Sequence, residues 1–177
     1  MTEPIRPKSP VKLDKELAVS KPAIKKSEDI SQEILKYITS TSEDFKSLKD
    51  YPIRQLVQDA QVFGPELKRQ KLETNQIRKF LDAINRLKAK FGQDDQEIEH
   101  SDMTETEKEN ARFAKVKDEI ILLKPKLAYA AARQDAVKSL SKVMSAAIDK
   151  VYTKEDFDRL VQLIESIIAY HKAEDGK

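Results

Sequence analysis

The sequence holds few side chains whose type and spacing fit catalysis, and most of them fall into two short patterns. Glu97 and His100 have the Glu-x-x-His spacing that places two metal ligands on one helix face in di-iron bundles. Such a site needs a second copy of the pattern and further carboxylates, whereas this copy lies in a polar connector. Ser139 and Lys142 match Ser-x-x-Lys, but the Ser-Asp-Asn and Lys-Thr-Gly partners of that enzyme class are missing from the sequence. Neither pattern predicts an active site.

The remaining chemistry-bearing residues point the same way. His171 closes an apolar stripe near the end of the chain, and we interpret it as a helix-end residue rather than a catalyst. The chain has no cysteine, which excludes disulfides and thiolate metal sites. Since no acid, base, nucleophile or metal-ligand set converges, we predict that the protein is not an enzyme and uses no cofactor and no metal.

The composition predicts an all-α fold. A chain of 177 residues favours one globular domain, and its three glycines are too few for the turns of a sheet and too far apart for a phosphate-binding loop. Alanine, leucine, lysine and glutamate favour helix instead. We find neither an apolar run of membrane-spanning length nor the apolar core of a secretory signal. We therefore expect a cytoplasmic protein that does not bind membranes.

The chain divides into four expected segments. Residues 1–28 hold four of the seven prolines and six lysines, which predicts a disordered, mildly basic arm. Residues 29–50 are expected to form a short helix or linker. Residues 51–172 form the predicted compact bundle of about five helices, with an acidic connector near 92–110, and residues 173–177 form a tail.

Apolar residues at helical spacing define the first two helices of this bundle. The first begins near Tyr51 and should break or bend at Gly64 and Pro65, because proline disrupts a helix interior. Thr74 is the expected N-cap of the second helix, and Gly92 is its expected C-cap.

Three further helices are expected after the acidic connector. Thr104 and Glu107 have the spacing of a capping box and predict the start of the third. This helix must accommodate Pro125, which we expect to bend or restart it. The fourth lies near 135–151, and Thr153 is the expected N-cap of the fifth.

Positive charge is distributed unevenly. Residues 54–90 contain nine lysines and arginines against four acids, whereas residues 92–110 contain eight acids and one lysine. The formal net charge of the whole chain is only +2, so any electrostatic function depends on this distribution. A basic helix and a complementary acidic connector would also support self-association.

Three basic residues lie off the apolar stripe of the second helix and therefore on its solvent side: Arg78, Lys79 and Arg86. Asp82 is one turn from both arginines, so ordinary ion pairs along the helix would neutralise part of this charge. The charge counts alone leave two interpretations open, a solvated face and an anion-binding face.

Three stretches together resemble a known family. They are TNQIRKFLDAINRLK (74–88), LLKPKLAYAAARQ (122–134) and IIAYHK (167–172), and they resemble the small subunit of the type III-A CRISPR effector, the Csm complex. The resemblance covers roughly residues 50 to 172. The Leu-Lys-Pro-Lys-Leu-Ala-Tyr-Ala motif is its most specific part, and Ala132 stands where the family commonly has glycine.

This resemblance implies a non-catalytic helical subunit that acts in antiviral defence. Several copies would associate into a short filament and contact phosphates of the guide–target RNA duplex. The implied partners are guide RNA, target RNA, other copies of the chain, and the backbone and large subunits of the complex. Tyr129 and Tyr170 are then expected to pack against protein rather than to stack on bases.

The residues expected to contact RNA are basic or amide side chains of the second helix, its surroundings and the central motif: Arg78, Lys79, Arg86, Lys124, Lys126, Arg133, Lys68, Lys71, Gln76 and Lys138. We expect them to converge on one stripe, with Gln76 either donating to a phosphate or supporting the helix start. The alternative is a helical adaptor or scaffold that binds only protein partners, with the basic residues as solubilising charge.

Overall fold

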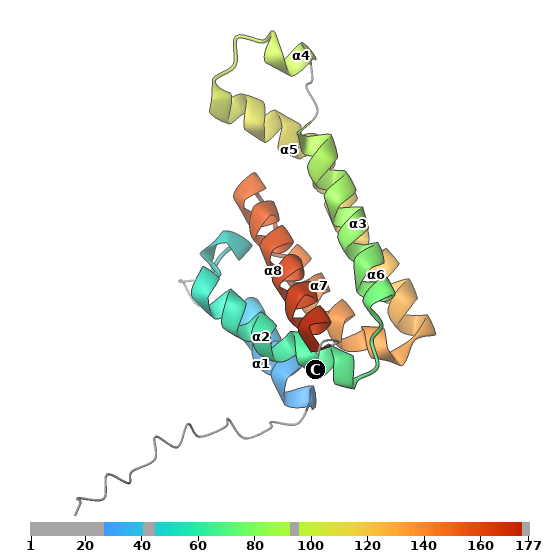
Figure 1. Cartoon of the computed structure of the whole chain (residues 1–177). Helices are drawn as coiled ribbons and strands as arrows, with labels where there is room; N and C mark the ends of the chain where they lie inside the picture. Colours follow the sequence, from blue (N-terminus) through green and yellow to red (C-terminus); the bar gives the residue numbers. More distant parts are fainter. Residues whose placement is uncertain (1–26, 41–44, 93–95, 175–177) are drawn as a thin grey trace, which may run out of the picture.

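The computed structural model describes residues 27–40, 45–92 and 96–174, and every regular element in these segments is helical. The all-α prediction is therefore confirmed (Figure 1). Nearly all of the arm predicted for residues 1–28 lies outside the described residues. The elements are α1 (Ser27–Thr39), η1 (Leu48–Asp50), α2 (Ile53–Arg69), α3 (Thr74–Phe91), α4 (Gln96–Glu99), α5 (Glu105–Ile121), α6 (Leu123–Arg133), η2 (Asp135–Val137), α7 (Lys138–Ile148) and α8 (Lys154–Ala173).

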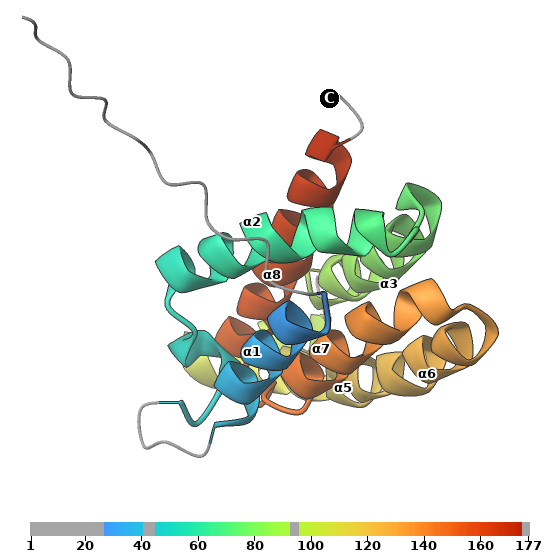
Figure 2. The same cartoon turned by 90° about the horizontal axis from the view of Figure 1, so that it is seen from below.

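Helix α8 is the central element of the bundle and packs against α2, α3 and α5 (Figure 1). Helix α7 packs against both α1 and α6, and Figure 2 shows α1 beside α7 and beneath α2. Helix α3 packs on α5 as well as on α8, while the short α4 lies at the end of the molecule opposite the C-terminus (Figure 1). The apolar stripes expected from the sequence face this shared core.

The prediction of a break at Gly64 and Pro65 is wrong, because α2 runs through both residues without interruption. A Cβ atom on Gly64 would lie 2.6 Å from the backbone nitrogen of His171 and 2.8 Å from the backbone oxygen of Ile167. Glycine therefore lets α2 and α8 pack backbone against backbone. Residues beyond the proline, such as the fully buried Leu67, belong to the shared core, and α2 packs along α8, so tertiary packing outweighs the local preference of proline.

The start of α3 differs by one residue from the prediction. Glu73 is the N-cap, because its backbone is extended while Thr74 is already helical. The side-chain oxygen of Gln76 accepts a hydrogen bond from the Glu73 backbone N–H at 3.1 Å, so Gln76 supports the helix start. The other predicted caps are confirmed at Gly92, Thr104 and Thr153.

Pro125 restarts the chain as a new helix, as expected. Helix α5 ends at Ile121 and α6 begins at Leu123, which places Pro125 in the first turn of α6, where a missing N–H breaks no helical hydrogen bond. The connector before α5 contains the extra helical turn α4, whose Ile98 is buried. The acidic connector predicted near 92–110 therefore includes one buried apolar side chain at α4.

A buried carboxylate connects the start of α8 to η1. Asp156 is fully buried and accepts backbone N–H groups from Lys49 at 2.7 Å, Tyr152 at 3.0 Å and Thr153 at 2.9 Å. These bonds satisfy donors that a helix N-terminus leaves unpaired. The segment before α2 thereby joins the bundle, and it also contributes apolar side chains to the same core: Ile30, Ile34, Ile38, Phe45 and Leu48.

Candidate nucleic-acid interface

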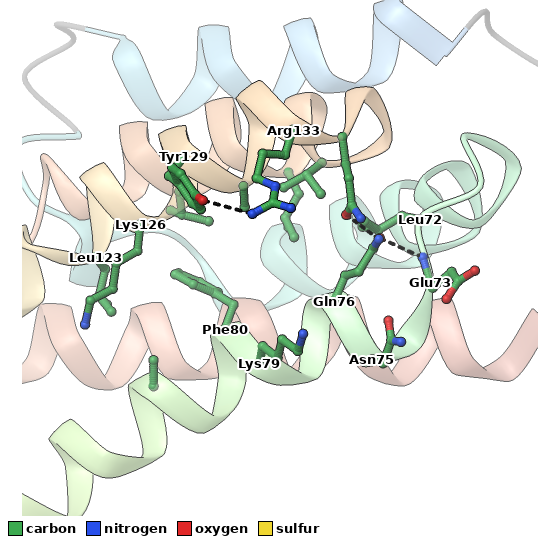
Figure 3. Close-up of a pocket in the computed structure, with 16 residues that line it drawn as sticks. Leu72, Glu73, Asn75, Gln76, Lys79, Phe80, Leu123, Lys126, Tyr129 and Arg133 are labelled. Carbon is green, nitrogen blue, oxygen red and sulfur yellow. Dashed lines mark hydrogen bonds between the residues drawn. The ribbon is translucent and has the colours of Figure 1, made fainter.

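A cleft of about 610 Å³ lies between the first half of α3 and the length of α6, and we call it the α3–α6 cleft. Its apolar lining includes the buried residues Phe80, Leu123 and Leu127. Its polar lining comes from both helices and the α6–η2 turn: Glu73, Asn75, Gln76, Lys79, Lys126, Tyr129, Arg133 and Gln134. Figure 3 shows Tyr129 and Arg133 projecting from α6 on one side, with Gln76, Lys79 and Phe80 on α3 opposite.

The cleft brings together four of the residues that the sequence suggested for RNA contact. Gln76 and Lys79 come from α3, and Lys126 and Arg133 come from α6, about 50 positions later in the chain. Lys79, Lys126 and Arg133 are exposed, so their charges are available to an anionic ligand. This part of the expected stripe therefore exists as one surface.

A second hollow of about 440 Å³ continues this surface along α3. Its lining includes Arg86, and it shares Lys126 with the α3–α6 cleft. Lys90 also lines it, but the Lys90 ammonium lies 2.7 Å from the Glu119 carboxylate on α5. Arg86 and Lys126 are thus the positive groups at this end that remain available.

Ion pairing separates the basic residues into two groups. Lys124 lies 2.5 Å from Asp149, and Lys138 lies 2.6 Å from Asp135. In the segments that the structure describes, no ion pair involves Lys79, Arg86 or Lys126. Three cations without an ion pair in these segments therefore line the two hollows, whereas Lys124 of the central motif is paired.

The other candidates lie outside both hollows. Arg78 is exposed on α3, and no ion pair joins it to Asp82 among the described residues. Lys68 lies near the end of α2 and is half-buried. Lys71 occupies the turn between α2 and α3 with a φ of 64°, a left-handed conformation uncommon for a lysine. These three residues do not contribute to the cleft itself.

Gln76 has two internal partners. Besides its bond to the Glu73 backbone, its side-chain nitrogen donates to the side-chain oxygen of Gln134, so it joins α3 to the end of α6 (Figure 3). Of the two roles considered for Gln76, support of the helix start is the one present in this structure.

Tyr129 is the residue of the cleft that sequence reasoning missed. The sequence predicts that it packs against protein, but its side chain is 64% exposed in this chain, whereas Tyr170 packs against the core. The Arg133 guanidinium donates to the Tyr129 hydroxyl at 2.9 Å and lies 5.6 Å from the ring centroid. Because Tyr129 is only two positions after buried Leu127, helical spacing alone places it on the opposite side of α6.

The residues considered for catalysis are not assembled into a site. Glu97 and His100 are both exposed, and the His100 ring bonds the backbone oxygen of Gln96 at 2.8 Å. His171 is fully buried and donates from Nε2 to the backbone oxygen of Leu72 at 2.7 Å. Within the described residues, no group of three histidine, aspartate or glutamate side chains could hold a metal ion. None of the helices in these segments is both long and apolar enough to cross a membrane.

The fold and the cleft together define an all-helical protein with a basic groove over an apolar floor. A family model described as Csm2 Type III-A matches residues 50–177, which include α2 to α8 and both hollows. The chain therefore belongs to the type III-A Csm2 family, the small subunit of the CRISPR Csm complex, and the resemblance noted from the sequence is confirmed. Members of this family are structural components that associate with other Csm subunits. No curated protein and no solved structure gave a significant match.

Proposed function

We propose that this chain is a non-catalytic small subunit that lines the guide–target RNA duplex of the type III-A complex through phosphate contacts. It also helps to assemble the effector filament. The complex would act in the cytoplasm, in antiviral defence. The observation that supports RNA contact most directly is the gathering of Lys79, Arg86 and Lys126 on one surface, where none of the three forms an ion pair with another described residue. Exposed lysines and arginines are common on protein surfaces, so the proposal rests on the gathering of these three side chains around one hollowed surface.

The chemistry of this surface suits a duplex backbone. Lysine and arginine bind phosphate oxygens through charge-assisted hydrogen bonds, and such contacts position a protein without reading sequence. Double-stranded RNA is recognised mainly by its shape and backbone, which matches cations spread over two helices. Arg133 extends the same surface at the far end of the cleft, beyond Lys126.

Assembly requires protein contacts as well, and the α5–α6 junction offers a candidate surface. Ile121 is 49% exposed and Leu122 is 55% exposed, and Leu122 also lines the hollow beside Arg86. Two large adjacent apolar side chains at the edge of a basic surface fit a contact with a neighbouring subunit or a second copy. Several copies arranged along one duplex would add their individually weak phosphate contacts.

We further propose that residues 51–172 are the bundle that makes these contacts, with residues 1–28 as a basic arm. Self-association through the acidic connector belongs to the same proposal. Part of the connector's charge is already paired within the chain, since Glu99 pairs with Arg112 and Glu109 lies 3.6 Å from Lys154. The acids that remain available, rather than all eight, would face another copy.

The salt dependence of target-RNA binding tests this proposal. Lys79→Ala, Arg86→Ala and Lys126→Ala variants are assembled into the Csm complex, and the RNA affinity is measured over a range of salt concentrations. Each lost phosphate contact should lower the slope of log affinity against log salt by about 0.7 to 0.9. Lys124→Ala should have a smaller effect, because Lys124 is paired with Asp149.

The matched control is Lys142→Ala, which removes an exposed lysine on α7 that lines neither hollow and should leave the slope unchanged. If the three cleft variants assemble normally but also leave the slope unchanged, RNA is held by other subunits. The chain would then act as the protein-only adaptor considered from the sequence.

A further inference from the structure

The geometry points to a binding site for one unpaired nucleobase inside the α3–α6 cleft. We propose that an RNA base leaves its stack and enters the cleft against the ring of Tyr129, while its phosphate lies near Lys79 and Lys126. This inference rests on the proposed function, because the same cations would hold the backbone, but it assigns the cleft a ligand that phosphate contact does not require.

The shape and lining of the cleft support a base rather than a phosphate as its occupant. Phosphate contact needs only an exposed cationic surface, whereas this cleft has a floor of buried apolar side chains that includes Phe80, Leu123 and Leu127. Its volume of about 610 Å³ lies within the range typical of small-ligand sites. A flat apolar ring would cover this floor, and a hydrated phosphate would not.

Tyr129 supplies the stacking surface. Its side chain is 64% exposed, although Leu127 two positions earlier is buried, and it lines the cleft. The hydrogen bond from Arg133 to its hydroxyl, at 2.9 Å, holds the ring at the edge of the cleft (Figure 3). Unstacked RNA bases commonly stack on exposed aromatic rings and on arginine planes, and Tyr129 and Arg133 provide both.

The ends of the cleft supply the polar contacts that a nucleotide needs. Lys79 and Lys126 lie on opposite helices and are not ion-paired in the described segments, so either can bind the phosphate beside the inserted base. The amides of Asn75 and Gln134 line the end near Gln76 and can donate to or accept from the edge of a base. The apolar floor and the Tyr129 ring thus suit the faces of a base, the amides suit its polar edge, and the lysines suit its phosphate.

The preferred ligand is therefore a duplex with one unpaired residue. A base within a continuous A-form helix is stacked on its neighbours and cannot enter a cleft. We would compare three RNA duplexes that share one sequence: fully paired, with one bulged uridine, and with an abasic residue at the bulge. Binding of each to the full chain is measured by fluorescence anisotropy at fixed salt, and a bulged 4-thiouridine reports contact through photocrosslinking.

The bulged duplex should bind about tenfold more tightly than the abasic one, equivalent to about 1.4 kcal/mol, a size that stacking on one aromatic ring can supply. Tyr129→Ala should abolish this difference, and Tyr129→Phe should retain most of it, because phenylalanine keeps the ring. Tyr152→Ala, which removes another exposed tyrosine that lies outside the cleft, should change nothing. The 4-thiouridine crosslink should map to α6.

Equal affinities for the bulged and abasic duplexes in the wild-type chain would overturn this inference. If paired duplex still binds with a steep salt dependence, only the base site is lost and phosphate contact survives. If no RNA binds or crosslinks to the full chain, the inference is overturned, while the proposed function is decided separately by the salt dependence measured in the assembled Csm complex. Bulge preference that persists in Tyr129→Ala would place the base elsewhere and would also overturn it.

Discussion

Replacing Gly64 by alanine tests the close backbone contact where α2 and α8 meet. Two effects oppose each other in this variant. Alanine is favoured over glycine in a helix interior by up to about 1 kcal/mol. Against this, the new Cβ atom would lie 2.6 Å from the backbone nitrogen of His171, 2.8 Å from the backbone oxygen of Ile167 and 2.9 Å from the Cβ of Tyr170.

The packing cost should exceed the gain in helix propensity. Two of the three clashing atoms belong to the backbone of α8, so they cannot move aside without separating the helices. Overpacking of a well-packed core costs about 1 to 3 kcal/mol, and this site lies at the severe end because no flexible side chain can yield. We therefore expect a net loss of about 1 to 2 kcal/mol in the free energy of unfolding, after subtracting the propensity term.

Urea denaturation followed by circular dichroism measures this loss. For a slope near 2 kcal/mol per molar urea, the midpoint should fall by about 0.5 to 1 M. The control is Gly92→Ala, because a Cβ there would meet its nearest atoms at 3.7 and 3.8 Å and the φ of Gly92 is −84°. This control should stay within about 0.5 kcal/mol of the original chain. A Gly64→Ala protein as stable as the original would refute the backbone contact.

Three further predictions concern side chains away from the cleft. Asp156→Ala should lower the free energy of unfolding, measured by urea denaturation, by about 2 to 3 kcal/mol, because several backbone N–H groups lose their acceptor. The control Asp158→Ala removes only a partly exposed ion pair and should lower it by less than about 1 kcal/mol. Equal losses in the two variants would contradict the role given to Asp156. Hydrogen bonds from Thr104 hold the pKa of Glu107 below its usual 4.5, so the stabilisation by this carboxylate is complete above pH 4.5 and is lost as the pH falls through the lowered pKa. Glu107→Gln should therefore flatten the loss of stability measured by urea denaturation between about pH 7 and pH 3, and parallel curves would refute it. Burial, and next a hydrogen bond to a carboxylate, raise the pKa of Tyr51 far above 10.0, so its contribution is complete below pH 10.0 and is lost as the pH rises further. Thermal melts of Tyr51→Phe above about pH 10 should show a shallower alkaline decline than the original chain, and an unchanged decline would count against this role.

The sequence predicts local features of this fold well and distant contacts poorly. Thr104 and Thr153 are recognisable as caps because the groups that they satisfy lie three residues away. Gly64 is misjudged as a helix breaker, because the contact that requires glycine there is made by α8, about 100 positions later. Pro125 is interpreted correctly, since a proline in the first turn of a helix is a local rule.

The same distinction applies to the candidate interface. The sequence shows that Lys79, Lys124 and Lys126 are basic. It does not show that Asp149, at the end of α7, pairs with Lys124. The pairing of Lys138 with Asp135 is predictable in principle, because residues three apart on a helical turn are neighbours.

Tyr129 was also predictable in principle. Its spacing from Leu127 places it away from the core, yet the family resemblance implied that it packs against protein. The cleft itself depends on how α3 and α6 approach each other, and this follows only from the packing of both helices within the whole bundle.

The measurement that tests the central claim most directly is RNA–protein crosslinking in the assembled Csm complex, with guide and target RNA bound. Crosslinked peptides of this chain are identified by mass spectrometry. Phosphate contact by the basic surface predicts crosslinks concentrated in α3 and α6, at peptides that contain Lys79, Arg86 or Lys126. Crosslinks confined to other helices, or RNA crosslinks found only on other subunits, would contradict it.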